Sequence, residues 1–157
     1  MVDAEDEQLR WLLDKQLNWI GTADSKLALL VPIPLAMLAI SLAEFGKKLK
    51  FLTAEDVPLL LSTGLLIGSL LFSLAVVISR TSGPAFSNIF FGTISKRTPA
   101  EFQSDILSMS ADEFRKDLIA QIHINSKIAS IKHQNISRAS FALALAVPVW
   151  LATLVRM

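Results

Sequence analysis

The residue types that most often perform catalysis are scarce or absent in this chain. It has no Cys and no Tyr, which excludes a thiol nucleophile, a disulfide and a cysteine-ligated zinc. The two histidines, His123 and His133, are ten residues apart and do not have the i, i+4 spacing that places two metal ligands on one helix face. No serine-hydrolase, phosphate-loop or zinc-peptidase motif is present. The sequence therefore predicts no enzyme, no metal site and no cofactor site.

The carboxylates stand at predicted helix starts, where capping explains them. Thr98 with Glu101, and Ser110 with Glu113, have the spacing of a capping box, in which a hydroxyl and a carboxylate satisfy the first free amides of a helix. The first of these starts predicts a short helix over about 99–108. The second predicts a long helix that meets no Gly or Pro until Pro148 near the chain end. Any functional side chains in this part of the chain must be positioned by these two helices.

The chain is organised around an uncharged apolar run from Val57 to Ile78. The run has 22 residues and contains no Asp, Glu, Lys or Arg. At 1.5 Å rise per residue a helix of this length crosses the roughly 30 Å hydrocarbon core of a bilayer. A soluble protein of 157 residues cannot bury such a helix on all sides. The chain is 18% charged, below the roughly 25% of soluble domains, and we expect a membrane protein.

Two further apolar stretches predict additional membrane spans. The first is LALLVPIPLAMLAISLAEF, where Pro32 and Pro34 interrupt the backbone hydrogen bonds and predict a kink or a locally irregular turn. The second is ASFALALAVPVWLATLV, with 17 residues close to the shortest length that spans a bilayer. Ahead of the first span, apolar residues at helical spacing predict an amphipathic helix.

The predicted fold is an all-α membrane protein with three transmembrane helices. The predicted segments are a cytosolic amphipathic helix (1–26), the first span (27–45), the second span (57–78), a cytosolic helical segment (80–138) and the third span (139–155).

The distribution of charge predicts the orientation. Segments 1–26 and 80–138 hold 11 of the 15 basic residues, and the positive-inside rule then places the N-terminus in the cytoplasm. Three lysines in one short connector, Lys47, Lys48 and Lys50, argue in the opposite direction. The formal net charge of +1 is too small for an electrostatic nucleic-acid binder.

Small residues in the second span favour close helix approach, and hence a homo-oligomer. They are Ser62, Gly64, Gly68, Ser69 and Ser73.

Three stretches carry a resemblance to a known family. They are LNWIGTADSKLALL (17–30), NIFFGTISKRTPAEF (88–102) and DLIAQIHINSKIASIKHQNISRASFALAL (117–145). In this order, over nearly the whole chain, they resemble the transmembrane effectors of Pycsar, bacterial antiphage systems built around a pyrimidine cyclase. The resemblance implies a membrane effector that senses cyclic CMP or cyclic UMP made by the cyclase partner. It implies that the effector then impairs the bacterial inner membrane, which gives abortive infection.

Such a ligand needs cations or helix-start amides for its phosphate and polar or planar groups for its base. Lys96 and Arg97 precede the Thr98 helix start, and polar residues follow on the long helix. The candidate ligand-binding residues are Gly92, Lys96, Arg97, Gln121, Asn125 and Lys127.

Other interpretations of these residues and of the whole chain stay open. Lys96 and Arg97 also suit the role of lipid anchors beside a membrane, and Gln121 and Asn125 that of interhelical hydrogen-bond partners. The alternative function is a structural or assembly subunit, not gated by a ligand, that holds another membrane protein. Such a subunit would be inert to cyclic nucleotides and would co-purify with a fixed partner.

Overall fold

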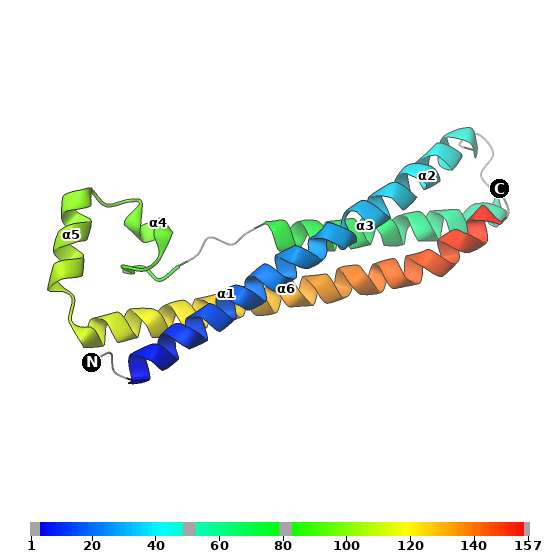
Figure 1. Cartoon of the computed structure of the whole chain (residues 1–157). Coiled ribbons are helices and arrows are strands. Elements are labelled where there is room, and N and C mark those ends of the chain that lie inside the picture. The colour runs from blue at the N-terminus through cyan, green and yellow to red at the C-terminus, as the bar shows by residue number, and fades with distance from the viewer. Residues whose placement is uncertain (1–3, 49–52, 79–82, 156–157) are drawn as a thin grey trace. The chain divides into compact units, whose positions relative to one another are not determined.

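The computed structural model describes residues 4–48, 53–78 and 83–155, and in these ranges it contains helices and no strand. The elements are α1 (Ala4–Leu30), α2 (Pro32–Lys48), the short 3₁₀ helix η1 (Ala54–Asp56), α3 (Val57–Val77), α4 (Phe91–Ile94), α5 (Pro99–Ser108) and α6 (Ala111–Leu154) (Figure 1). Three helical stretches, Ala4–Gly46, Ala54–Val77 and Ala111–Leu154, are long and apolar enough to cross a membrane. The predicted fold class is confirmed.

The chain divides into two compact units, and the division falls inside α1 and α6. The first unit combines residues 1–22 with 79–131, and the second combines residues 23–78 with 132–157. Each of the two long helices therefore contributes residues to both units.

The two prolines interrupt the first span as predicted. Helix α1 continues beyond the predicted boundary at residue 26 and ends at Leu30, and α2 begins at Pro32. Hydrogen bonds from Val31 N to Leu27 O (3.1 Å) and from Leu35 N to Val31 O (3.2 Å) bracket the interruption. Because proline has no amide hydrogen, the ladder cannot continue through this point without gaps.

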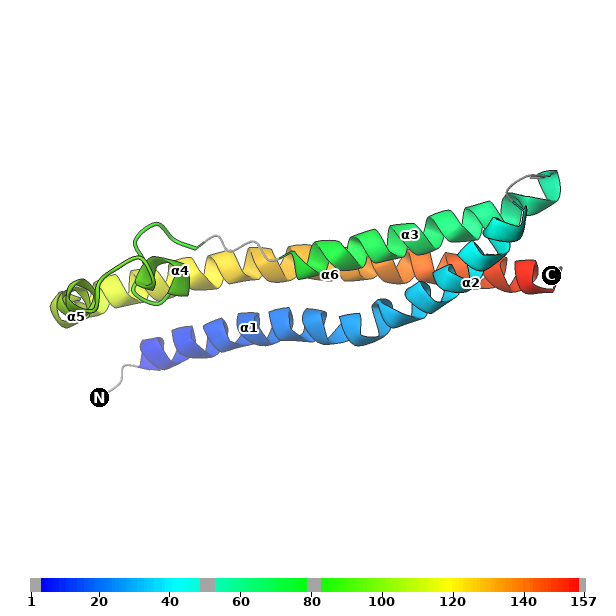
Figure 2. The ribbon, with the colours of Figure 1, turned by 90° about the horizontal axis from the view of Figure 1, so that it is seen from above.

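The second unit is an antiparallel helical bundle. One apolar cluster joins Leu30, Val76 and Ile136, and a second joins Met37, Leu66 and Ala146. Residue numbers fall along α3 as they rise along α2 and α6, so α3 runs opposite to both (Figures 1 and 2).

Serine side chains form hydrogen bonds between the helices of this bundle. Ser69 Oγ on α3 donates to Ala139 O on α6 (2.9 Å), and Ser73 Oγ donates to Leu30 O (3.3 Å). Both serines are fully buried. A Cβ placed at Gly64 or Gly68 would meet nothing within 4 Å. The serines of α3 therefore pack inside the chain, whereas the two glycines do not make a close helix contact within it.

An ion pair and a cation–π contact add polar contacts to the second unit. Lys132 Nζ lies 2.5 Å from Asp24 Oδ1, with the Lys132 side chain 9% exposed and that of Asp24 45% exposed. The Arg138 guanidinium lies 5.9 Å from the centre of the Phe72 ring. Arg80, Lys50 and Arg156, which enter the predicted charge bias, lie outside the described residues.

The first unit packs the N-terminal part of α1 against the start of α6. Arg115 Nε on α6 donates to Asp6 Oδ1 on α1 (2.7 Å). The Arg10 guanidinium lies 5.3 Å from the centre of the Phe114 ring. Helices α4 and α5 belong to the same unit, and α5 spans residues 99–108 as the sequence predicts. This unit holds the candidate site.

Candidate functional site

A cavity of about 510 Å³ lies in the first unit, formed by the segment before α4, by α5 and by the first turns of α6. Pockets that bind small molecules commonly have volumes of roughly 300 to 1,000 Å³. The apolar part of the lining includes Phe86 and Met109. The polar part brings together both charges and an amide, from Asn88, Arg97, Asp105, Lys116 and Asp117.

Two capping boxes fix the helix ends around this cavity. Glu101 Oε2 accepts hydrogen bonds from the backbone N (2.7 Å) and the hydroxyl (2.8 Å) of Thr98. Glu113 Oε2 accepts the corresponding pair from Ser110 (2.8 and 2.7 Å). The Thr98 backbone amide and then its hydroxyl lower the pKa of Glu101. Desolvation opposes this shift, and the charge of Arg97 adds a lesser lowering. Both predicted helix starts are therefore present.

Ser87 is the centre of the segment before α4. Its Oγ is buried and accepts hydrogen bonds from Phe90 N (2.9 Å), Ile89 N (3.1 Å) and Gln121 Nε2 (2.9 Å). Thr93 Oγ1 donates to Ser87 O at 2.6 Å. One hydroxyl thus satisfies two backbone amides in the segment and one side chain of α6, which holds that segment on the helix.

Arg97 is held by three acceptors. Its NH1 donates to Asn88 Oδ1 and lies 3.1 Å from Asp105 Oδ2, and its NH2 donates to Ser87 O at 3.5 Å. The side chain is 20% exposed. Because a guanidinium has five N–H donors in a rigid plane, Arg97 keeps donors for a ligand while its position is fixed.

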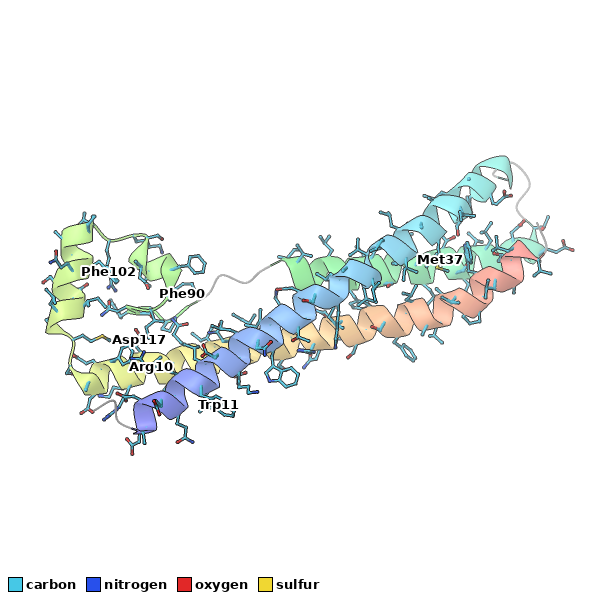
Figure 3. The ribbon with its side chains drawn as sticks, viewed as in Figure 1. Arg10, Trp11, Met37, Phe90, Phe102 and Asp117 are labelled. Atoms are coloured by element: carbon cyan, nitrogen blue, oxygen red, sulfur yellow. The ribbon has the colours of Figure 1, made fainter. Side chains whose placement is uncertain are left out.

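Asp117 carries a buried oxygen that has no partner. The residue lies on α6 (Figure 3) and is 7% exposed. Its Oδ2 accepts a hydrogen bond from Asn88 N at 2.7 Å, whereas its Oδ1 is buried without a hydrogen-bond partner among the described residues. A buried polar atom left unpaired is destabilising and uncommon in folded proteins. Asp117 Oδ1 is therefore a candidate acceptor for a hydrogen-bond donor that the described residues do not supply.

The structure divides the residues that the sequence singled out. Arg97 lines the cavity, and with Lys96 it also lines a neighbouring hollow next to Glu101. Gly92 lies beneath an aromatic ring, since a Cβ at this position would come within 2.5 Å of Phe90 Cε1. The packing of Phe90 explains this glycine without a ligand.

The other three predicted residues do not line this cavity. Gln121 is buried and bonded to Ser87, which satisfies it within the chain. Asn125 follows one turn later on the same helix face, and Lys127 is exposed. Of the six predicted residues, Arg97 alone belongs to the cavity with the unpaired carboxylate.

The sequence interpretation missed Asn88, Lys116 and Asp117. A signal for Asp117 was present, because it stands between Phe114 and Leu118 on the apolar stripe of the long helix. An acidic residue at a buried position requires a partner. Asn88 had no comparable signal, since its backbone amide meets Asp117 only through the tertiary fold.

Comparison with known proteins gives one family match. The model described as "Pycsar effector protein domain" matches residues 8–157, nearly the whole chain. No curated protein and no solved structure matches.

Proposed function

The chain belongs to the Pycsar effector family, and from this premise we propose that it senses a cyclic pyrimidine mononucleotide and then impairs the inner membrane. The family gives the chain its role in antiphage defence. The ligand, cyclic CMP or cyclic UMP, would come from a pyrimidine nucleotide cyclase partner. The outcome would be abortive infection, in which the infected cell stops before phage matures.

The observation that carries this proposal is the composition of the cavity in the first unit. A cyclic mononucleotide presents one phosphate charge, a ribose hydroxyl and the polar edge of a base. The cavity offers Arg97 and Lys116 as cations and Asn88 and Asp117 as polar groups, beside the apolar surface of Phe86. Charge-assisted bonds from a guanidinium suit a phosphate. Its volume of about 510 Å³ falls within the usual range for small-ligand sites.

The second unit supplies the membrane part of the proposal. Its helices carry large exposed apolar side chains, among them Leu61, Leu71 and Leu74 on α3, which suit contact with lipid. We place the N-terminus in the cytoplasm from the bias of basic residues. No catalytic step is needed, because a ligand changes a membrane protein by binding one of its states more tightly than the other.

Helices α1 and α6 provide a covalent route between sensing and output. Each contributes residues to both units, so a change in the helix ends of the first unit is passed along an unbroken backbone. A homo-oligomer in the membrane would convert such a change into loss of integrity. A ligand that binds both states equally would have no such effect.

The test is calorimetric titration of the full chain in detergent with cyclic CMP and cyclic UMP. Cyclic AMP and cyclic GMP are the controls. Saturable binding of a pyrimidine nucleotide, together with loss of membrane potential when the cyclase is active in cells, is the expected result. Folded protein that gives no heat with any of the four contradicts the proposal and favours an assembly subunit with a fixed partner.

A further inference from the structure

We infer that Asp117 reads the base of the bound nucleotide and makes this protein a sensor of cyclic CMP in preference to cyclic UMP. The inference rests on the proposed function, since it assigns a specificity to the same cavity.

The two oxygens of Asp117 are not equivalent. Oδ2 is held by the backbone N–H of Asn88 at 2.7 Å. Oδ1 is buried with no partner in the described part of the chain, and the residue lines the cavity. A carboxylate accepts hydrogen bonds and donates none. A ligand that pairs with this oxygen must therefore bring an N–H or O–H group.

The other carboxylates that line the cavity are already engaged. Glu113 Oε2 accepts two bonds from Ser110 in the capping box. Asp105 Oδ2 pairs with Arg97 at 3.1 Å, and the Asp105 side chain is half exposed. Among the described residues, the one other buried side-chain atom without a partner is Thr63 Oγ1 in α3. Asp117 is thus the cavity residue whose pairing is incomplete.

Cytosine supplies the missing donor, and uracil does not supply it at the same place. The exocyclic amino group of cytosine donates to carboxylates, a pairing known from base recognition by Asp and Glu. Uracil has a carbonyl oxygen at that position, and its single N–H stands between two carbonyls. With uracil the carboxylate would face an acceptor, so both groups would lose their partners.

Arg97 and Lys116 leave Asp117 free for the base. Both cations line the same cavity. The phosphate of the nucleotide is attracted to these cations, whereas the Asp117 carboxylate repels it. The nucleotide is thereby oriented, with its charge at the cations and its base at Asp117. A site built to pair with one polar group discriminates strongly against the analogue that lacks it.

The decisive variant is Asp117→Asn, which changes one atom and keeps the shape. Asn88 N–H still needs an oxygen, so the amide places its oxygen there and its NH₂ at the position of Oδ1. The unpaired acceptor becomes a donor that suits the uracil carbonyl. We expect the wild-type protein to bind cyclic CMP about 10- to 100-fold more tightly than cyclic UMP, and we expect Asp117→Asn to lose or reverse this preference.

Glu101→Gln is the matched control. It makes the same change in a capping-box carboxylate that does not line this cavity, and glutamine still completes the box. Its preference should remain that of the wild-type protein. A second measurement needs no variant: N4,N4-dimethyl cyclic CMP lacks both amino hydrogens and should bind the wild-type protein at least tenfold more weakly than cyclic CMP, in line with the range above.

The outcomes separate the two proposals. Binding of both nucleotides with equal affinity, or a preference for cyclic UMP, overturns the assignment to Asp117 and leaves the sensor function standing. A cyclic CMP preference that Asp117→Asn does not change also overturns it. If neither nucleotide binds the folded wild-type protein, the sensor function and the base assignment both fail.

Discussion

Ser87 Oγ and Gln121 Nε2 lie 2.9 Å apart although 34 residues separate them in the chain. This bond ties the segment before α4 to the middle of α6. It also gives a partner to Gln121, for which the sequence allowed two roles, ligand binding or an interhelical hydrogen bond. Gln121 thus has a structural contact in the first unit, with the segment whose residues Phe86 and Asn88 line the cavity.

Ser87→Ala should destabilise the first unit. The change removes the acceptor for Phe90 N, Ile89 N and Gln121 Nε2, and buried donors left unpaired cost about 1–3 kcal/mol each, less where water can enter. We expect about 2–4 kcal/mol in total and a lower melting temperature in detergent. Ser126→Ala on α6, where the hydroxyl donates to His123 O in an exposed hydrogen bond, is the control. Equal melting temperatures for the two variants would contradict this account.

Gly92→Ala tests whether this glycine serves packing. The new Cβ would come within 2.5 Å of Phe90 Cε1, and overpacking costs about 1–3 kcal/mol. We expect a lower melting temperature. Nucleotide affinity should fall only through this loss of stability and not through a lost ligand contact. Gly21→Ala in α1, where a Cβ meets nothing within 4 Å, should be neutral or slightly stabilising. A Gly92→Ala protein that keeps its stability but loses binding would assign Gly92 to the ligand instead.

Arg97→Lys should weaken nucleotide binding although it keeps the charge. Lysine cannot reproduce the planar set of donors that now reaches Asn88, Asp105 and Ser87 O. We expect affinity for cyclic CMP to fall about 10- to 100-fold, the equivalent of about 1.5–3 kcal/mol for bonds to charged groups. Arg115→Lys, which alters a paired arginine outside the cavity, is the control. Calorimetric titration of both variants decides between them, and equal affinities would remove Arg97 from the site.

Asp24→Asn should destabilise the second unit because it leaves Lys132 without its carboxylate. The Lys132 side chain is 9% exposed, whereas Asp24 is 45% exposed. Solvent screening of Asp24 reduces the cost of breaking the pair to about 1–2 kcal/mol. The double change Asp24→Asn with Lys132→Met removes the buried charge as well and should recover most of the loss. Melting temperatures of the wild type, both single variants and the double variant form the cycle, and strict additivity would show that the pair is not coupled.

Acid should loosen the start of α5. The Thr98 amide, followed by its hydroxyl, lowers the pKa of Glu101 from its usual 4.5. A group with a lowered folded-state pKa stabilises the fold fully above its unfolded-state value and loses this contribution as the pH falls through the folded-state value. Hydrogen exchange of α5 amides, corrected for the intrinsic rate, should therefore rise below about pH 4.5. Glu101→Gln keeps the box without titrating and should show no such rise; the same rise in this variant would assign the effect elsewhere.

The sequence predicted the features that depend on neighbouring residues and on the solvent. Apolar length fixes where a helix can cross a bilayer, so α3 was found from Val57 onward. Capping boxes act over three residues, so they are visible in the sequence. The box at Thr98 predicted the start of α5, and the box at Ser110, which begins the next helix, limited its end. The prolines at 32 and 34 lack amide hydrogens whatever surrounds them, and the break between α1 and α2 lies beside them.

The candidate site depended on contacts that no local pattern encodes. Asn88 meets Asp117 across 29 residues, and Arg97 meets Asn88 through the turn that Ser87 holds. Of the six predicted residues, Arg97 lines the cavity. The sequence could indicate it because a cation beside a helix start is visible in neighbouring residues. Whether a carboxylate oxygen is paired depends on which backbone amide the fold brings to it. The sequence determined a three-span helical protein, and the tertiary structure decided that Asp117 Oδ1 is a buried acceptor with no hydrogen-bond partner among the described residues.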